Sequence, residues 1–176
     1  MSTNQLRRSI EDLLDEPSMT LATKGESGDP HAAAVYFVSD EQINLYFFSD
    51  PDSQHAQDNA RDPRAAVAIN GEHAGWREIH GLQMRGLISS IDESIERQDG
   101  WILYKKKFPF VIDLEEIILM NQMYVFKPQW IRLIDNRIEF GYKKEWVKTT
   151  TVAGAINQAQ WRLTSEKQEI FRDKDA

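Results

Sequence analysis

Hydroxyl, amide and imidazole side chains gather between residues 49 and 55, in the stretch SDPDSQH. Asp52 or Ser53 is a suitable N-cap for a helix over residues 53–61. The first N–H groups of a helix lack partners within it and readily bind anions, with help from nearby hydroxyls. The stretch therefore predicts either a phosphate site or an ordinary capped helix, and the acids Asp50 and Asp52 favour the capped helix.

Two neighbouring predicted strands carry unusually small side chains, at residues 32–34 and at Ala66 and Ala68. Small side chains let a flat ring lie against the backbone, but they also let strands and helices pack closely. On a later strand Gln83 and Arg85 alternate with apolar residues, which places an amide and a guanidinium on one face. That pattern indicates either a site for a heterocycle or a solvent-facing strand.

Metal and nucleophile sites are not predicted. The four histidines are His31, His55, His73 and His80. None has an HxH or HxxxH spacing with a suitable carboxylate nearby. A triad of Ser53, His55 and Asp58 would lie on one short helix, and the chain has no G-x-S-x-G elbow. We therefore name no catalytic residue.

The composition is that of a folded soluble protein. Its 176 residues are 41% hydrophobic and 28% charged, which suits a single domain over residues 1–176. The net charge of −7 argues against nucleic acid and anionic lipid as partners. The chain has neither a leader pattern nor an apolar run of roughly 20 residues, so we expect a cytoplasmic protein without membrane contact. Without cysteine, redox chemistry would need a bound cofactor.

Apolar periodicity predicts a helix over about 2–15, then three consecutive antiparallel strands over 18–24, 31–39 and 43–49. Further strands are predicted over 64–71 and 80–91. A helix follows over about 92–107. Residues 110–120 read as a short helix or a buried strand.

The last part of the chain is predicted to form closing strands over 123–128, 130–135 and 137–142. Good helix formers between spaced apolar residues then predict a C-terminal helical extension over about 152–173. Trp161 and Phe171 on that helix would need a surface to cover, on the barrel or on a second chain.

The order of these motifs resembles a known family. SMTLATKGESGDPHAAAVYFVSDEQINLYFFS, then SQHAQDNARDPRAAVAI and GLQMRG, are similar to the pyridoxamine 5'-phosphate oxidase-like flavin-binding split barrel over about residues 17–91. YKKKFP and WIRLIDNRIEFGYKKEW resemble a small uncharacterised bacterial branch of that superfamily. The resemblance implies a mainly β fold with peripheral helices: a six-stranded antiparallel split barrel. It also implies a homodimer with one flavin mononucleotide (FMN) in each of two clefts between the subunits.

The resemblance assigns cofactor-binding positions. The phosphate-loop positions are Ser49, Ser53, Gln54 and His55. The strand residues beside the isoalloxazine ring are Ala33, Ala34 and Val35, and Gln83 would contribute from the fifth strand, across the dimer. Many flavin-binding members carry lysine or arginine where this chain has His55. A neutral imidazole there supplies a hydrogen bond without a permanent charge.

These observations lead to one functional prediction and two alternatives. The prediction is a homodimeric FMN-dependent oxidoreductase of pyridoxamine 5'-phosphate oxidase type, acting on a small molecule. The first alternative is a cofactor-free barrel that binds another small ligand or has a regulatory role. The second is a haem or deazaflavin binder on the same fold.

Overall fold

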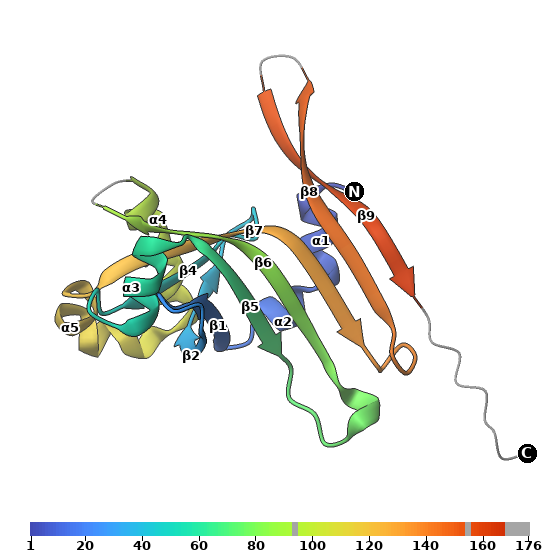
Figure 1. Cartoon of the computed structure of the whole chain (residues 1–176), viewed down its shortest axis with the longest axis horizontal. Helices are drawn as coiled ribbons and strands as arrows, with labels where there is room; N and C mark the ends of the chain where they lie inside the picture. Colours follow the sequence, from blue (N-terminus) through green and yellow to red (C-terminus); the bar gives the residue numbers. More distant parts are fainter. Residues whose placement is uncertain (93–94, 154–155, 168–176) are drawn as a thin grey trace, which may run out of the picture.

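The computed structural model describes residues 1–92, 95–153 and 156–167, which form an antiparallel sheet with peripheral helices (Figure 1). The sheet has nine strands: β1 Ser18–Lys24, β2 Pro30–Tyr36, β3 Val38–Ser39, β4 Leu45–Ser49, β5 Arg64–Asn70, β6 His80–Ile91, β7 Gln122–Asp135, β8 Lys143–Ala153 and β9 Ile156–Lys167. The helices are α1 Thr3–Ser9, α2 Glu11–Leu14, α3 Gln54–Arg61, η1 Trp76–Glu78, α4 Ile95–Lys107, η2 Pro109–Leu114 and α5 Glu115–Leu119.

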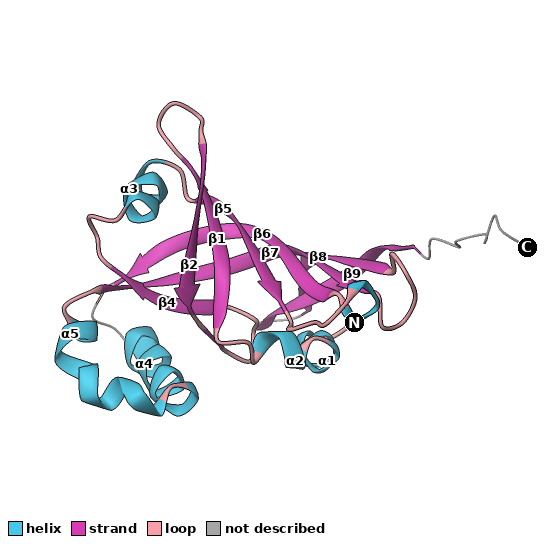
Figure 2. Ribbon diagram, turned by 90° about the horizontal axis from the view of Figure 1, so that it is seen from below, coloured by secondary structure: helices cyan, strands magenta, loops and turns pink. Residues whose placement is uncertain are grey.

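The strand order is β2-β1-β5-β6-β7-β4-β3, and β8 pairs with both β7 and β9. The sheet curls, so its concave face encloses most of the core while the helices lie around its rim (Figure 2). Alternation along β6 shows the two faces: Leu82 and Met84 are buried, whereas Gln83 and Arg85 are exposed. We call the face that carries Gln83 and Arg85 the outer face.

Two apolar clusters support the sheet. The larger one joins α1 and α2 to the concave face through Leu6, Ile10 and Leu13, all fully buried. The smaller one packs α4 and η2 against β3, β4 and β7, with Tyr104 and Phe108 beside Val125. The helices therefore cover parts of the sheet that are apolar and leave the outer face of its centre open.

The predicted fold class is confirmed, because the protein is mainly β with a curled antiparallel sheet and peripheral helices. The number of strands differs from the expected six, since the sheet has nine. The predicted strands at 18–24, 64–71 and 80–91 are present with shifts of at most one residue at their ends. The predicted helix over 2–15 is split into α1 and α2 at Ile10.

The prediction of three consecutive antiparallel strands is confirmed for the first pairing and only in part for the second. β1 and β2 form the expected hairpin, but the second predicted strand, 31–39, is divided after Tyr36, and only Val38 and Ser39 pair with β4. β4 then pairs with β7, which lies more than 70 residues later in the chain. Local turn signals cannot reveal this long-range pairing.

The expected break between strands 123–128 and 130–135 is absent, because β7 runs through Pro128. A bulge between Arg85 and Gly86 accommodates the proline, which pairs with Gly86. Residues 137–142 form a turn rather than the expected strand. Asp135 accepts the N–H of Arg137 at 3.0 Å, and Gly141 has a φ of 75° that favours a turn.

The predicted helix over 152–173 is also wrong, because residues 156–167 form β9. Helix propensity is a weak prior, and pairing along β8 overrides it. Trp161 is buried in the core, and its backbone N–H donates to the carbonyl of Met1 at 3.1 Å. Trp161 is therefore covered by the N-terminal helix of its own chain. Phe171 lies outside the described residues.

No helix in the described part of the chain is long and apolar enough to cross a membrane.

Candidate functional site

Three of the predicted phosphate-loop residues meet at the start of α3. Ser49 ends β4, and its Oγ lies 2.6 Å from Nε2 of His55 and 3.1 Å from Oγ of Ser53. Ser53 Oγ also lies 3.2 Å from the same imidazole nitrogen. Ser53 is the N-cap of α3, yet its side chain forms no capping bond because it faces Ser49 and His55.

The first turn of α3 offers unpaired donors beside this cluster. The N–H groups of Gln54, His55 and Ala56 have no acceptor among the described residues, as helix geometry requires. The carboxylate of the nearby Asp50 is engaged within its own loop, because its Oδ1 accepts the N–H of Asp52 at 2.8 Å. Two hydroxyl groups and the first N–H groups of the helix thus lie close together at the start of α3.

The charge of His55 is set by its surroundings. Burial lowers the pKa of His55, although the attraction of Asp58 partly opposes that effect. The imidazole is therefore neutral at pH 7 in the unliganded protein. A dianion bound beside it would raise its pKa and recruit a proton.

A second cluster fixes the middle of α3 to the β1–β2 hairpin. Asp58 is fully buried and accepts hydrogen bonds from four side chains. Its donors, at 2.7–2.9 Å, are Thr23, His31, Gln54 and Arg61. Gln54, a predicted phosphate-loop residue, is therefore engaged with Asp58.

The Asp58 carboxylate stays ionised. Burial alone would raise its pKa, but the bonds from His31, Gln54 and the other two donors outweigh burial and hold its pKa well below the usual range. Because Nδ1 of His31 is bound to Asp58, its Nε2 is the ring nitrogen left for other contacts. The His31 side chain is 40% exposed.

The predicted strand residues do not share one face. Val35 packs against the core, and Ala33, two residues away, is on the same side of β2. Ala34 is on the outer face, opposite Thr20 of β1. Gln83 is also on the outer face, so the structure separates Ala34 and Gln83 from the residues at the start of α3.

A cavity of about 470 Å³ lies on the outer face of β1, β5, β6 and β7. Cross-strand pairs build it: Ala22 pairs with Ala66, and Ala66 with Arg85. Its lining is completed by Thr20, Val67, Ala68, Gln83, Met84, Trp130 and Arg132. The small residues noted in the sequence form the apolar part of this lining.

The two arginines of this cavity differ in their partners. Arg132 forms an ion pair with Glu145 at 2.7 Å and donates to Oε1 of Gln83 at 3.2 Å. The guanidinium of Arg85 lies 4.1 Å from the ring centre of Trp130. Within the described ranges no acceptor takes a hydrogen bond from Arg85.

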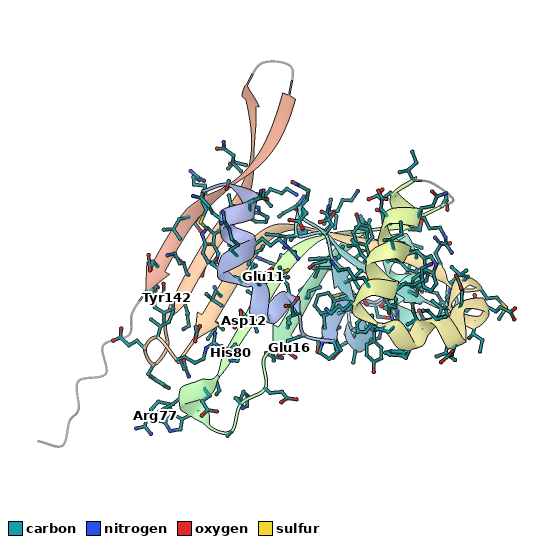
Figure 3. The ribbon with its side chains drawn as sticks, turned by 180° about the vertical axis from the view of Figure 1, so that it is seen from behind. Glu11, Asp12, Glu16, Arg77, His80 and Tyr142 are labelled. Atoms are coloured by element: carbon teal, nitrogen blue, oxygen red, sulfur yellow. The ribbon has the colours of Figure 1, made fainter. Side chains whose placement is uncertain are left out.

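The other histidines lie elsewhere. His73 is in the loop before η1, and His80 begins β6 beside α2, with Nε2 3.9 Å from Asp12 (Figure 3). Nδ1 of His80 faces the carbonyl of Glu78 at 2.8 Å. No group of three or more potential metal ligands lies together among the described residues.

Sequence reasoning missed the Asp58 cluster and two cavity residues, Trp130 and Arg132. Asp58 was considered only as part of a triad, and nothing in the sequence indicates that Thr23 and His31 reach it. The spacing of Trp130 and Arg132 by two residues within a strand was a signal that both share a face.

Comparison with known proteins gives relatives of the same fold. The UPF0306 protein YhbP of Escherichia coli is 29% identical over 119 residues, which are 66% of this chain and 76% of YhbP. The haem-binding protein of Mycobacterium smegmatis superposes with a TM-score of 0.67 at 19% identity, over 84% of this chain and 58% of that one. HutZ, the haem storage protein of Vibrio cholerae, gives 0.60 at 15% identity, over 73% and 91%.

The structural likenesses, at these identities, concern the fold alone. A family model described as pyridoxamine 5'-phosphate oxidase matches residues 6–135, which include α3, the outer-face cavity and most of the sheet. The resemblance read from the sequence is thereby confirmed. The chain belongs to the pyridoxamine 5'-phosphate oxidase family.

Proposed function

We propose that this protein binds FMN at the start of α3 and acts, as a homodimer, as a flavin-dependent oxidoreductase on a small molecule. The observation that carries the proposal is the meeting of Ser49, Ser53 and His55 beside three unpaired N–H groups of α3. These are the donors that a phosphate requires. The family match supports a cofactor at this fold.

In this proposal each residue has a limited task. The hydroxyls of Ser49 and Ser53 and the N–H groups at the start of α3 bind the phosphate. His55 adds a hydrogen bond and takes up a proton when the phosphate binds. Strand β2, which bears Ala33, Ala34 and Val35, lies beside the ring. Gln83, which lies on the outer face, contributes only to the flavin of a second copy.

The flavin itself, when bound, supplies hydride or electron transfer, and the protein binds and orients it. Asp58 is not a general base here, because it is fully buried and its oxygens are occupied by four donors. Its task is to hold α3 against β1 and β2, and so to fix the position of the phosphate donors.

The proposed dimer has an apolar surface to bury. The described part of α4, η2 and α5 exposes large apolar side chains. Those more than half exposed are Ile95, Ile102, Phe110, Ile112, Ile117 and Met120. Exposed apolar groups gathered in this way mark interaction surfaces.

Light scattering should give the mass of two chains. The mass of one chain at micromolar concentration would rule out the dimer and a shared cleft.

Titration of FMN fluorescence tests the phosphate site. We expect His55→Lys to tighten FMN binding about tenfold, because a permanent cation then faces the phosphate. His55→Ala should weaken it about threefold or more, since one hydrogen bond is lost. The matched control is His73→Ala, in an exposed loop, which should leave affinity unchanged. Unaltered affinity in both His55 variants would show that His55 has no phosphate role.

Haem is a second candidate ligand, and one observation favours it. His31 Nδ1 lies 2.7 Å from the Asp58 carboxylate, and histidines that bind a metal usually donate their other N–H to such a group. The His31 side chain is 40% exposed, and its Nε2 is thus the imidazole nitrogen best prepared to bind iron. Two of the structural neighbours are described as haem proteins.

Haemin titration separates the two candidates. If haem is the ligand, a Soret band should remain with the protein after gel filtration and disappear in His31→Ala but not in His73→Ala. If FMN is the ligand, flavin bands should remain and His31→Ala should change FMN affinity little. Retention of neither compound would favour the cofactor-free barrel that binds another small ligand.

A further inference from the structure

A cavity of about 250 Å³ lies where α1 and α2 meet the end of α4 and the turn between β3 and β4. Its lining contains three cations, Arg7, Lys106 and Lys107, and two carboxylates, Asp15 and Glu41. Both carboxylates are exposed, and the Glu41 side chain is 81% exposed. Because water screens exposed charges, these carboxylates offset the cations of the cavity only weakly.

Arg7 lines the cavity from α1, and only 16% of its side chain is exposed. Its Nη1 donates to Oγ of Ser39 at 2.9 Å and to the carbonyl of Asp40 at 2.8 Å. Both acceptors are neutral, and Nε lies 3.8 Å from the exposed carboxylate of Glu41. Neutral acceptors hold the guanidinium in place without cancelling its charge. Ser39 also lines the cavity, and a hydroxyl that accepts one bond still has a hydrogen to donate.

Lys107 ends α4 and is held in a similar way. Its Nζ donates to the carbonyls of Leu14 and Glu16, at 3.0 and 2.6 Å, and lies 4.0 Å from the ring centre of Phe37. In the described part of the chain no carboxylate forms an ion pair with Lys107. The second cation of the cavity is therefore also fixed by uncharged groups.

The charge of Lys107 is unfavourable at this position. Burial lowers the pKa of Lys107 to about 8, and the like charge of Arg7 lowers it too, although Asp15 and Glu16 oppose the shift. An anion between Lys107 and Arg7 would relieve the repulsion between them and stabilise the ammonium. Binding of such an anion above that pH would therefore be accompanied by uptake of a proton.

The apolar lining and the charge count limit the kind of anion. Leu14, Val38 and Leu103 line the cavity beside the cations and can contact a short apolar body. Three cations and two carboxylates leave an excess of one positive charge, which suits a monoanion better than a dianion. A volume of about 250 Å³ lies just below the range of sites for drug-sized ligands, so a smaller molecule fits.

We propose that this cavity binds a small organic monocarboxylate, with its carboxylate between Arg7 and Lys107 and its apolar body against Leu14, Val38 and Leu103. The cavity shares no lining residue with the outer-face cavity and none with the residues assigned to the flavin. Figure 2 shows α1, α2 and α4 well apart from α3. The proposal does not depend on whether α3 binds FMN.

Calorimetry with three matched probes, at about pH 7 and low salt, tests the ligand class. The probe 4-methylpentanoate carries a carboxylate and an apolar body, 4-methylpentanamide lacks the charge, and acetate lacks the apolar body. We expect 4-methylpentanoate to bind about tenfold or more tightly than either of the others, because each of them loses one part of the recognition. Equal affinity for the amide or for acetate would overturn the proposal.

Variants of two lysines test the position of the carboxylate. Lys107→Met removes the ammonium and keeps the length of the side chain, so it should weaken 4-methylpentanoate about tenfold and change the amide less than about twofold. Lys105→Gln is the matched control, because Lys105 lies on the same helix, 5.4 Å from the Trp101 ring centre, and does not line the cavity. It should leave both affinities unchanged. Circular dichroism and thermal melting check that each variant is folded.

Arg7→Lys keeps the charge and removes the planar fork, so we expect a smaller loss of 4-methylpentanoate affinity than in Lys107→Met. A loss in Lys105→Gln equal to that in Lys107→Met, or unchanged affinity in Lys107→Met, would show that the carboxylate does not bind in this cavity.

Proton uptake is measured on the unaltered protein and needs no folded variant. Calorimetry of 4-methylpentanoate in two buffers with different enthalpies of ionisation gives the number of protons taken up per ligand bound. We expect uptake at about pH 8.5 and almost none at about pH 6.5, where Lys107 is already charged. Binding without proton uptake at the higher pH would contradict the proposal, as would absence of any binding up to about 10 mM.

Discussion

Asp58 and Arg85 are charged residues on opposite sides of the same sheet, and their surroundings differ completely. Asp58 is buried and accepts from four side chains that come from β1, β2 and α3. Arg85 is exposed in a cavity and stacked on Trp130, and its charge helps to lower the pKa of Glu145. One charge is satisfied by hydrogen bonds inside the fold, and the other is accessible to solvent.

The difference shows how to separate structural from functional polar groups in this protein. A buried charge must have all its partners inside the molecule, or folding would be too costly. An exposed cation such as Arg85 keeps its hydrogen bonds to water and needs no partner within the fold. The cluster of Ser49, Ser53 and His55 combines both situations. Its side chains form hydrogen bonds with each other, while the adjacent N–H groups of α3 have no acceptor among the described residues.

The largest expected effect is on stability, at Asp58. Asp58→Ala would leave His31, Thr23, Gln54 and Arg61 without their common acceptor and should lower the free energy of unfolding by about 3–5 kcal/mol. Urea denaturation followed by circular dichroism measures this change. A loss of less than about 1 kcal/mol would mean that the cluster does not hold α3 in place.

Arg85→Gln should change the free energy of unfolding far less than Asp58→Ala does. Its free energy of unfolding should stay within about 0.5 kcal/mol of the unaltered protein, because the side chain is exposed. Urea denaturation followed by circular dichroism measures this change as well. If instead stability fell as far as in Asp58→Ala, Arg85 would belong to the fold, and the contrast between the two residues would be lost.

Thr23→Val tests a single bond of the Asp58 cluster. Valine has nearly the shape of threonine but donates no hydrogen bond, so the variant should lose about 1 kcal/mol of stability in urea. Thr20→Val, on the outer face of the same strand, is the control and should lose less. Equal losses in the two variants would mean that the bond from Thr23 to Asp58 contributes nothing specific.

The smallest expected effect is a pH dependence caused by His55. Burial lowers its pKa in the folded protein, so below about pH 6.5 the unfolded chain takes up this proton first, and stability falls. His55→Gln should lack this part of the decline. Urea midpoints of the two proteins, measured from about pH 8 down to about pH 5, should therefore converge or cross at low pH. Parallel curves would show that His55 is not buried in its neutral form.

The sequence allowed prediction of the hairpin of β1 and β2, the long strand β6 and the helix α3, because each has a local pattern of alternation or capping. The pairing of β4 with β7 joins residues far apart in sequence, and β9 formed where helix propensity pointed otherwise. Both depend on tertiary contacts, such as the burial of Trp161 against α1.

The candidate site was predictable to a similar degree. The serines and His55 were identified because they lie close together in sequence near a helix start. The link between His31 and Asp58 was not, since 27 residues separate them and only the packing of α3 on β2 brings them together. The Arg85 cavity could be anticipated as a polar strand face, but its partners on β7 required the sheet register.

The most direct test of the proposed function is an absorption spectrum of the purified protein after incubation with FMN or haemin and removal of excess by gel filtration. We predict flavin bands that remain with the protein, at one per chain, and no retained Soret band. A retained Soret band without flavin, or a featureless spectrum in both cases, would contradict FMN binding at the start of α3.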